Sequence, residues 1–105
     1  MVKAIVGKLL VDAVLQDGKR IELDARIRPP YEGEDHYWVC RVQIKPLQGE
    51  PVDVRGVDSF HAIWLALSLV LKLLTQLRAS GARLENRDGS EFPLDAYLAG
   101  FDEKT

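Results

Sequence analysis

The chain has 105 residues, 47% of them hydrophobic and 29% charged, a composition that supports one globular domain with a real core and excludes a disordered chain. Its formal net charge is -2, so it lacks the dense basic footprint that nucleic-acid binding requires. No segment has the ~20 uninterrupted apolar residues of a membrane span. The single cysteine, Cys40, allows no internal disulfide, which is typical of a reducing compartment. We therefore expect a cytoplasmic protein that binds neither nucleic acid nor membrane.

Four strands in antiparallel succession are expected in the first half of the chain. The second of them alternates between apolar and charged residues, as a strand with one buried and one solvated face does. Asp17-Gly18 precedes it and predicts a two-residue type I′ hairpin turn, and two prolines end it because proline cannot donate to a ladder. The polar loop 29–35 that follows is a candidate recognition loop. The expected strands cover residues 3–16, 19–28, 36–45 and 50–55.

A long helix is expected over residues 59–80. Asp58 is a favourable N-cap because its carboxylate can accept hydrogen bonds from the first turn, and Gly81 can take the left-handed conformation that ends a helix. Residues 82–85 suit a short strand, and a short helix is expected from Pro93 to Gly100. The sequence thus predicts an α+β fold as a single domain over residues 1–105: a four-stranded antiparallel meander packed on one long apolar helix, with a short C-terminal strand and helix.

The expected helix is more apolar than a single sheet face can cover. Apolar residues occupy most of its circumference and leave only a narrow polar stripe. One side carries Phe60, Ile63, Leu67, Leu71 and Leu74. Three coverings are open: the C-terminal segment of the same chain, a second copy in a homodimer, or an apolar element of another protein. Our hypothesis for the helix surface around Trp64 and Leu65 is burial between subunits.

No catalytic, cofactor or metal motif is present, and no cofactor is expected. The two histidines are not part of a spaced set of metal ligands. Cys40 lies on the apolar face of its strand, where an inert buried thiol is the simpler interpretation, and a constellation of Cys40, His61 and Asp58 is the catalytic alternative. Core packing likewise explains the tryptophans more simply than stacking on a ligand does. The residues retained as interface or pocket candidates are Trp38, Cys40, Asp58, His61, Trp64 and Leu65.

Three segments carry a resemblance to a known family. GVDSFHAIWLALSLVLKLL opens the long helix, and GARL and DGSEFPL follow it. They resemble a widespread bacterial family of small uncharacterised proteins, known only as a domain of unknown function, in which a hairpin-rich first half leads into such a helix. The matching residues are Gly56, Val57, Asp58, Ser59, Phe60 and Ala62 at the helix start, Asp88, Gly89, Phe92 and Pro93 in the tail, and Trp38 and Cys40 in a W-x-C-like strand. His61 departs from the expected glutamine, which puts in doubt any role assigned to that position. The resemblance implies a fold and a bacterial origin, and it implies no activity.

These observations favour a non-enzymatic protein-interaction module. Few motifs, balanced charge and an over-apolar helix suit a protein that binds itself or another protein, and a toxin-neutralising immunity protein is one version. The alternative is a small-molecule binder or small enzyme with a pocket between helix and sheet, using Cys40, Asp58, His61 and the tryptophans. Whether those side chains converge separates the two interpretations.

Overall fold

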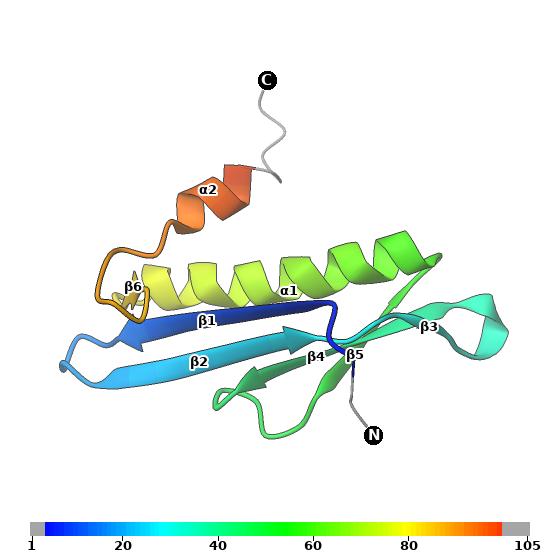
Figure 1. Ribbon diagram of the computed structural model, residues 1–105, viewed down its shortest axis with the longest axis horizontal. Helices are drawn as coiled ribbons and strands as arrows, with labels where there is room; N and C mark the ends of the chain where they lie inside the picture. Colours follow the sequence, from blue (N-terminus) through cyan, green and yellow to red (C-terminus); the bar gives the residue numbers. More distant parts are fainter. Residues whose placement is uncertain (1–3, 100–105) are drawn as a thin grey trace.

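The alternating apolar residues of the first half form strands β1 (Gly7–Val14) and β2 (Arg20–Ile27), which pair as an antiparallel hairpin. The computed structural model describes residues 4–99, and in it the sheet carries one long helix on a single face (Figure 1). Lys3 and Gly100, where two expected elements begin and end, lie outside the described residues. The predicted α+β class is confirmed.

The turn between β1 and β2 differs from the predicted type I′ geometry. The Leu15 N–H donates to the Lys19 carbonyl at 2.8 Å, and the Gly18 N–H donates to the Leu15 carbonyl at 2.9 Å, so the loop holds three residues rather than two. Within it only Gly18 has a positive φ, +88°, whereas a type I′ turn requires one at both central positions. The Asp17 carboxylate instead accepts from the Lys19 N–H at 2.9 Å, which explains the aspartate.

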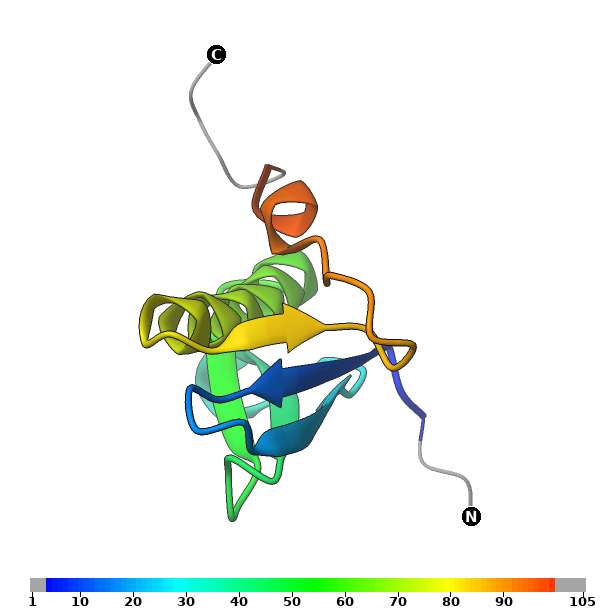
Figure 2. The same ribbon diagram turned by 90° about the vertical axis from the view of Figure 1, so that its left-hand side faces the viewer.

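The predicted four-stranded meander forms the centre of a six-stranded sheet. β2 pairs with β4 (Trp38–Lys45), and β4 pairs with β5 (Val52–Gly56), both in antiparallel register. β6 (Arg83–Glu85), predicted as a short strand, pairs with β1 (Figure 2). The sixth strand, β3 (Tyr31–Glu32), lies in the expected loop and pairs with β4. The two prolines before it lack N–H groups and interrupt the ladder, and the chain resumes hydrogen bonding to β4 beyond them.

Helix α1 (Ser59–Ala79) has the predicted boundaries, but it turns a different side to the sheet from the one its largest residues suggest. Leu71 and Leu74 are buried, whereas Phe60 and Leu67 are exposed. The side against the sheet carries smaller residues at a spacing of four, namely Ala62, Ala66, Val70 and Leu74. Alanine allows the helix backbone to approach the sheet closely. A Cβ on Gly56 would lie 2.8 Å from the Ala62 Cα, so this contact requires glycine in β5.

One side of α1 belongs to the core of this globular fold. By length and composition alone it is the one helix within residues 4–99 that could cross a membrane. Its buried side nevertheless packs on fully buried residues of three strands, such as Val11 in β1, Leu23 in β2 and Val42 in β4. The apolar composition of α1 is therefore used partly for this core and partly for a surface on the other side of the helix.

The C-terminal segment covers the second half of α1. Short helix α2 (Leu94–Leu98) lies across α1 from the sheet, so that three layers are stacked (Figure 2). Leu94 is buried, and the Phe92 and Tyr97 rings stack with centroids 4.9 Å apart. Arg78 in the last turn of α1 forms an ion pair with Asp95 at 3.0 Å. The internal covering considered from the sequence is thus confirmed for the second half of the helix.

Candidate functional site

Asp58 and His61 meet at the start of α1, where they form the helix cap. The Asp58 carboxylate accepts a hydrogen bond from the His61 backbone N–H at 2.7 Å, and the His61 Nδ1 accepts one from the Val57 N–H at 3.0 Å. Two backbone donors at the helix start are satisfied by side chains, as in a capping box, with histidine where glutamate or glutamine is usual. The glutamine that the resemblance implies at this position suits the same capping role, so the pair has a structural task.

Cys40 has a hydrogen-bond partner outside the Asp58–His61 cap. Its side chain is fully buried in β4, and its thiol donates to the Arg28 carbonyl at 3.3 Å. Burial raises the pKa of the Cys40 thiol, and the negative charge of Asp53 raises it further. The structure therefore brings Asp58 and His61 together as a cap and gives Cys40 a separate partner. A protonated, buried thiol is a component of the core, as its position on the apolar strand face suggests.

The remaining candidates differ in exposure. Trp38 is half-buried in β4 and packs against the core, and Leu65 is half-buried on α1. Trp64 is 45% exposed on the outward side of α1. Of the six residues singled out from the sequence, Trp64 is thus the one that lies on an open apolar surface.

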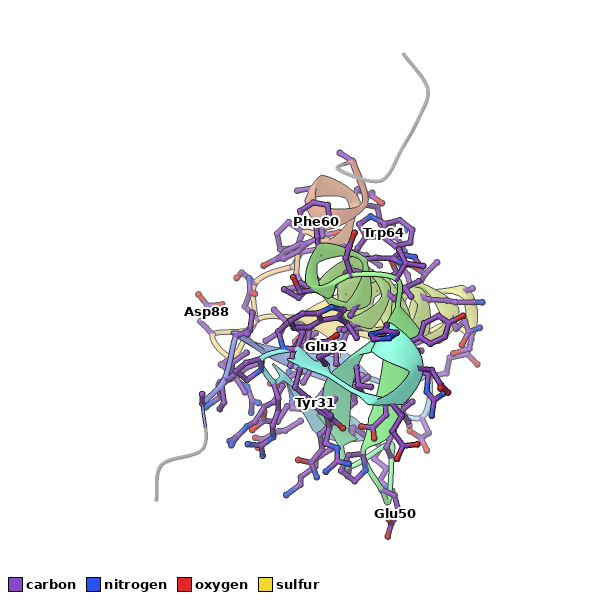
Figure 3. The ribbon with its side chains drawn as sticks, turned by 90° about the vertical axis from the view of Figure 1, so that its right-hand side faces the viewer. Tyr31, Glu32, Glu50, Phe60, Trp64 and Asp88 are labelled. Atoms are coloured by element: carbon purple, nitrogen blue, oxygen red, sulfur yellow. The ribbon has the colours of Figure 1, made fainter. Side chains whose placement is uncertain are left out.

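That surface is a row of side chains just before α1 and along its first half, which we call the α1 ridge. Its members are the exposed large apolar residues Val57, Phe60, Trp64 and Leu67. Phe60 is 80% exposed and Val57 67% exposed, values that are unusual for such residues. Figure 3 shows Phe60 and Trp64 on the side of the helix away from the sheet. Phe60, Trp64 and Leu67, at a spacing of four and three residues, lie on one helix face, the arrangement that packs against another helix, and Val57 lies just before the helix cap.

A pocket lies beside the α1 ridge, between α1 and the open end of the β1–β2 hairpin, where β1 begins and β2 ends. Its volume is about 290 Å³, and we call it the α1–β1 pocket. Leu67 belongs both to the ridge and to the pocket wall, and Tyr97 of α2 closes one side. The hollow exists because Gly7 and Ala25, on the helix-facing side of the sheet, are small. The alternative interpretation of the sequence includes a pocket between helix and sheet, but it assigns Cys40, Asp58, His61 and the tryptophans to that pocket, and none of them lines the α1–β1 pocket. The signal for its actual position was the glycine within the first apolar strand.

An ion-pair cluster occupies the opposite face of the sheet. Asp12 is 3% exposed and lies between Arg20, at 2.8 Å, and Arg87, at 3.3 Å. Arg20 also reaches Glu85 at 2.7 Å, and Arg87 reaches Glu22 at 3.1 Å. These charges neutralise one another and hold the 86–90 turn against the sheet. Among residues 4–99, no group of three or more His, Cys, Asp or Glu side chains is arranged to hold a metal ion.

The predicted recognition loop forms the tip of the β3–β4 hairpin, which extends at the same end of the molecule as the start of α1 (Figure 1). Its turn, 3-10 helix η1 (Glu34–His36), contains two consecutive residues with positive φ, Asp35 at +61° and His36 at +65°. Glu32 lies on this hairpin, below Phe60 and Trp64 in Figure 3. Three acidic residues, Glu32, Glu34 and Asp35, therefore lie at the end of the molecule that carries the start of the α1 ridge (Figure 1).

The chain belongs to a family described as a domain of unknown function (DUF6968), which it matches over residues 12–94. No curated protein and no solved structure matches it. The matched range includes α1 with its ridge and most of the sheet, and it ends at the first residue of α2.

Proposed function

We propose that this chain is a non-enzymatic protein-interaction module that docks through the α1 ridge. The observation that carries the proposal is the exposure of Phe60, which is 80% accessible on a helix whose opposite side is buried in the core. A large aromatic side chain at an exposed position is a common anchor of protein interfaces. The free, reduced Cys40 supports a cytoplasmic location, and the resemblance supports a bacterial origin.

The energy available from the ridge is sufficient for specific binding. Burying a Phe, a Val and a Leu side chain at ~25 cal/mol per Å² contributes several kcal/mol before the costs of association are subtracted. Three of the four ridge residues, Phe60, Trp64 and Leu67, also sit on a rigid helix, so little conformational entropy is lost when a partner orders them. The α1 ridge therefore has both the chemistry and the rigidity of a docking surface.

The charge around the ridge favours a protein over a lipid bilayer as its partner. Anionic lipids attract helices that carry lysine and arginine beside their apolar face. Here the first half of α1 has no basic residue, and the neighbouring hairpin carries Glu32, Glu34 and Asp35. An acidic surface of this kind is repelled by an anionic membrane.

A second candidate function, small-molecule binding, is favoured by the α1–β1 pocket. Its volume of about 290 Å³ is close to the lower end of the range of ligand sites, about 300–1,000 Å³. Its walls are almost entirely apolar, so its ligand would be a small apolar molecule. The candidate catalytic residues Cys40, Asp58 and His61 are absent from these walls, which favours binding over chemistry.

The test is photo-crosslinking from the ridge. The photoreactive analogue p-benzoylphenylalanine is placed at Phe60 and, as a control, at Leu47, which is 40% exposed in the β4–β5 turn. In cells that produce the protein, irradiation should join the chain to a protein from position 60 and not from position 47. Equal crosslinking from the two positions, or none from position 60, would contradict the proposal.

A second measurement distinguishes a lipid partner from a protein partner. The purified wild-type chain and a Phe60→Asp variant are sedimented with vesicles of phosphatidylcholine and phosphatidylglycerol. We expect neither chain to follow the vesicles. Vesicle binding that disappears in the variant would assign the α1 ridge to a membrane surface and overturn the protein-interaction proposal.

A further inference from the structure

We infer that the occupant of the α1 ridge is a second copy of this chain, in a twofold dimer in which each Phe60 inserts into the α1–β1 pocket of its partner. The inference rests on the proposed function, because it names the partner of the same surface. It goes beyond that proposal by joining the ridge and the pocket into one interface.

A projecting side chain and a matching hollow lie on the same face of the molecule. Phe60 precedes Leu67, the residue shared by ridge and pocket, by seven positions, or ~10 Å along the helix. An apolar cavity of about 150 Å³ is large enough to bind benzene. The α1–β1 pocket, at about 290 Å³, therefore has room for a phenyl ring. Tyr97 on its wall would supply an aromatic neighbour for that ring.

A twofold axis satisfies both copies at once. In a symmetric dimer the same patch occurs on both sides, so a surface must be complementary to itself. If two α1 helices pack antiparallel with the axis near residue 64, residue 60 of each lies opposite residues 67–68 of the other. Each Phe60 then faces the pocket wall formed by Leu67 and Leu71. One symmetry operation thus fills both pockets and covers both ridges.

The position of α2 limits where the partner helix can lie. α2 already packs on the second half of α1, held by buried Leu94 and by the Arg78–Asp95 ion pair. The first half carries exposed Phe60 and Leu67 on the continuation of the same helix face. A second α1 is an element of the same type as α2, and it would complete the layer that α2 begins. Contact with α2 would stop the partner helix from sliding further along α1.

The charges on α1 suit the antiparallel arrangement. The described helix has no acidic side chain, and its two basic residues, Lys72 and Arg78, lie in its second half. Its cap, Asp58, lies at the other end. An antiparallel partner brings Lys72, which forms no ion pair within the described chain, near Asp58 of the second copy, and it aligns the helix dipoles favourably. A parallel pair would place like charges beside each other.

The experiment is sedimentation velocity of the full chain between about 1 and 100 µM, a range that resolves a dissociation constant in the micromolar region. The wild type should shift from 11.8 kDa to twice that mass as its concentration rises. Phe60→Asp should remain monomeric, since an aspartate cannot enter an apolar pocket. The matched control Leu47→Asp adds the same charge at an exposed apolar residue outside the interface and should dimerise like the wild type.

A second pair of variants tests insertion into the pocket. A Cβ added at Gly7 meets no atom within 4 Å, and Gly7 lines the pocket, so we expect the side chain of Gly7→Leu to occupy the pocket and to leave the ridge intact. We expect it to weaken dimerisation at least tenfold. The control Gly49→Leu adds the same side chain in open space at the β4–β5 turn and should have no effect.

The outcomes separate this inference from the proposed function. A wild type that stays monomeric up to about 100 µM, or a dimer that Gly7→Leu does not weaken, overturns reciprocal insertion. If the wild type stays monomeric while position 60 crosslinks to another protein, the interaction module stands and the partner is a different chain. If the wild type stays monomeric and position 60 crosslinks to no protein, the proposed function is overturned as well.

Discussion

Phe60 and Leu67 lie seven residues apart on one exposed face of α1, and Leu67 is at the same time a wall of the α1–β1 pocket. This relationship links the two unusual surfaces of the molecule, an exposed aromatic side chain and an apolar hollow. Neither alone would assign a binding partner, because small domains expose many apolar atoms and contain shallow clefts. Their shared residue makes them one continuous apolar surface, which is the basis for assigning it to a binding partner.

The close approach of α1 to the sheet predicts a strong effect at Gly56. A Cβ there would overlap the backbone of Ala62, so Gly56→Ala should lower the free energy of unfolding by about 3 kcal/mol or more. Gly49→Ala is the control, because its added methyl group meets no atom within 4 Å. Urea denaturation of the two variants measures the difference. A Gly56→Ala protein as stable as its control would show that α1 does not pack on β5 as described.

The ion-pair cluster predicts that replacing aspartate by asparagine lowers the free energy of unfolding by different amounts at two positions on one sheet face. Asp12 is buried between Arg20 and Arg87, so Asp12→Asn should cost about 1–3 kcal/mol, since its amide nitrogen faces cationic donors without a partner. Asp24 pairs with Arg26 near the surface at 3.0 Å, and Asp24→Asn should cost less than about 1 kcal/mol. Chemical denaturation at neutral pH compares them. Equal costs would mean that the Asp12 site is solvated.

Acid should weaken the fold through its arginine-paired carboxylates. The hydrogen bond from Arg41 holds the pKa of Asp53 below its ordinary value, and Arg26 does the same for Asp24. The folded carboxyl then binds fewer protons than the unfolded one, so the stability from these pairs is present above the unfolded pKa of about 4 and is lost as pH falls through the folded pKa. The free energy of unfolding should therefore decline below about pH 4.

The variant Arg41→Gln isolates one of these pairs. Without the guanidinium, the pKa of Asp53 returns toward its ordinary value, so the variant should lose less stability than the wild type between pH 7 and pH 3. The pair is partly exposed and screened by solvent, which keeps the difference small. Identical pH profiles for the two proteins would show that the pair contributes nothing.

Because its thiol is buried, we expect Cys40 to react slowly with alkylating reagents. Because burial raises its pKa and the side chain is fully inaccessible, iodoacetamide at pH 8 should leave the native chain unmodified and alkylate it only in denaturant. Mass spectrometry of the two samples gives the answer directly. Rapid alkylation of the native protein would revive the catalytic alternative that involves Cys40.

The sequence was sufficient where structure is decided locally. The cap at Asp58 and the glycine at position 81, which has φ +105°, define α1 because both act on adjacent backbone. Strict alternation likewise identifies β2, whose apolar side faces the helix. Strand β3 was harder to predict, since two prolines mark a loop and only pairing with β4 makes it a strand. Features that depend on one neighbouring residue or on the period of apolar residues were therefore predictable, apart from the geometry of the β1–β2 turn.

The rest depended on contacts between distant segments. Side-chain size suggests that Phe60 faces the core, yet Ala62 and Ala66 do so because the helix backbone must approach β5. Of the candidate site residues, Trp64 lies on the exposed surface, whereas Cys40 is a core residue whose thiol bonds to Arg28. The α1–β1 pocket arises from small residues on neighbouring strands, and sequence spacing within one strand does not reveal such a juxtaposition.

The most direct test of the account maps where position 60 crosslinks in the purified protein. Chains with p-benzoylphenylalanine at position 60 are mixed with ¹⁵N-labelled wild-type chains, irradiated, digested and analysed by mass spectrometry. The account predicts a crosslink between the two isotopic forms, with the adduct on Leu67, Leu71 or Tyr97 in the pocket wall. Adducts confined to one chain, or intermolecular adducts spread over surfaces away from the α1–β1 pocket, would contradict it.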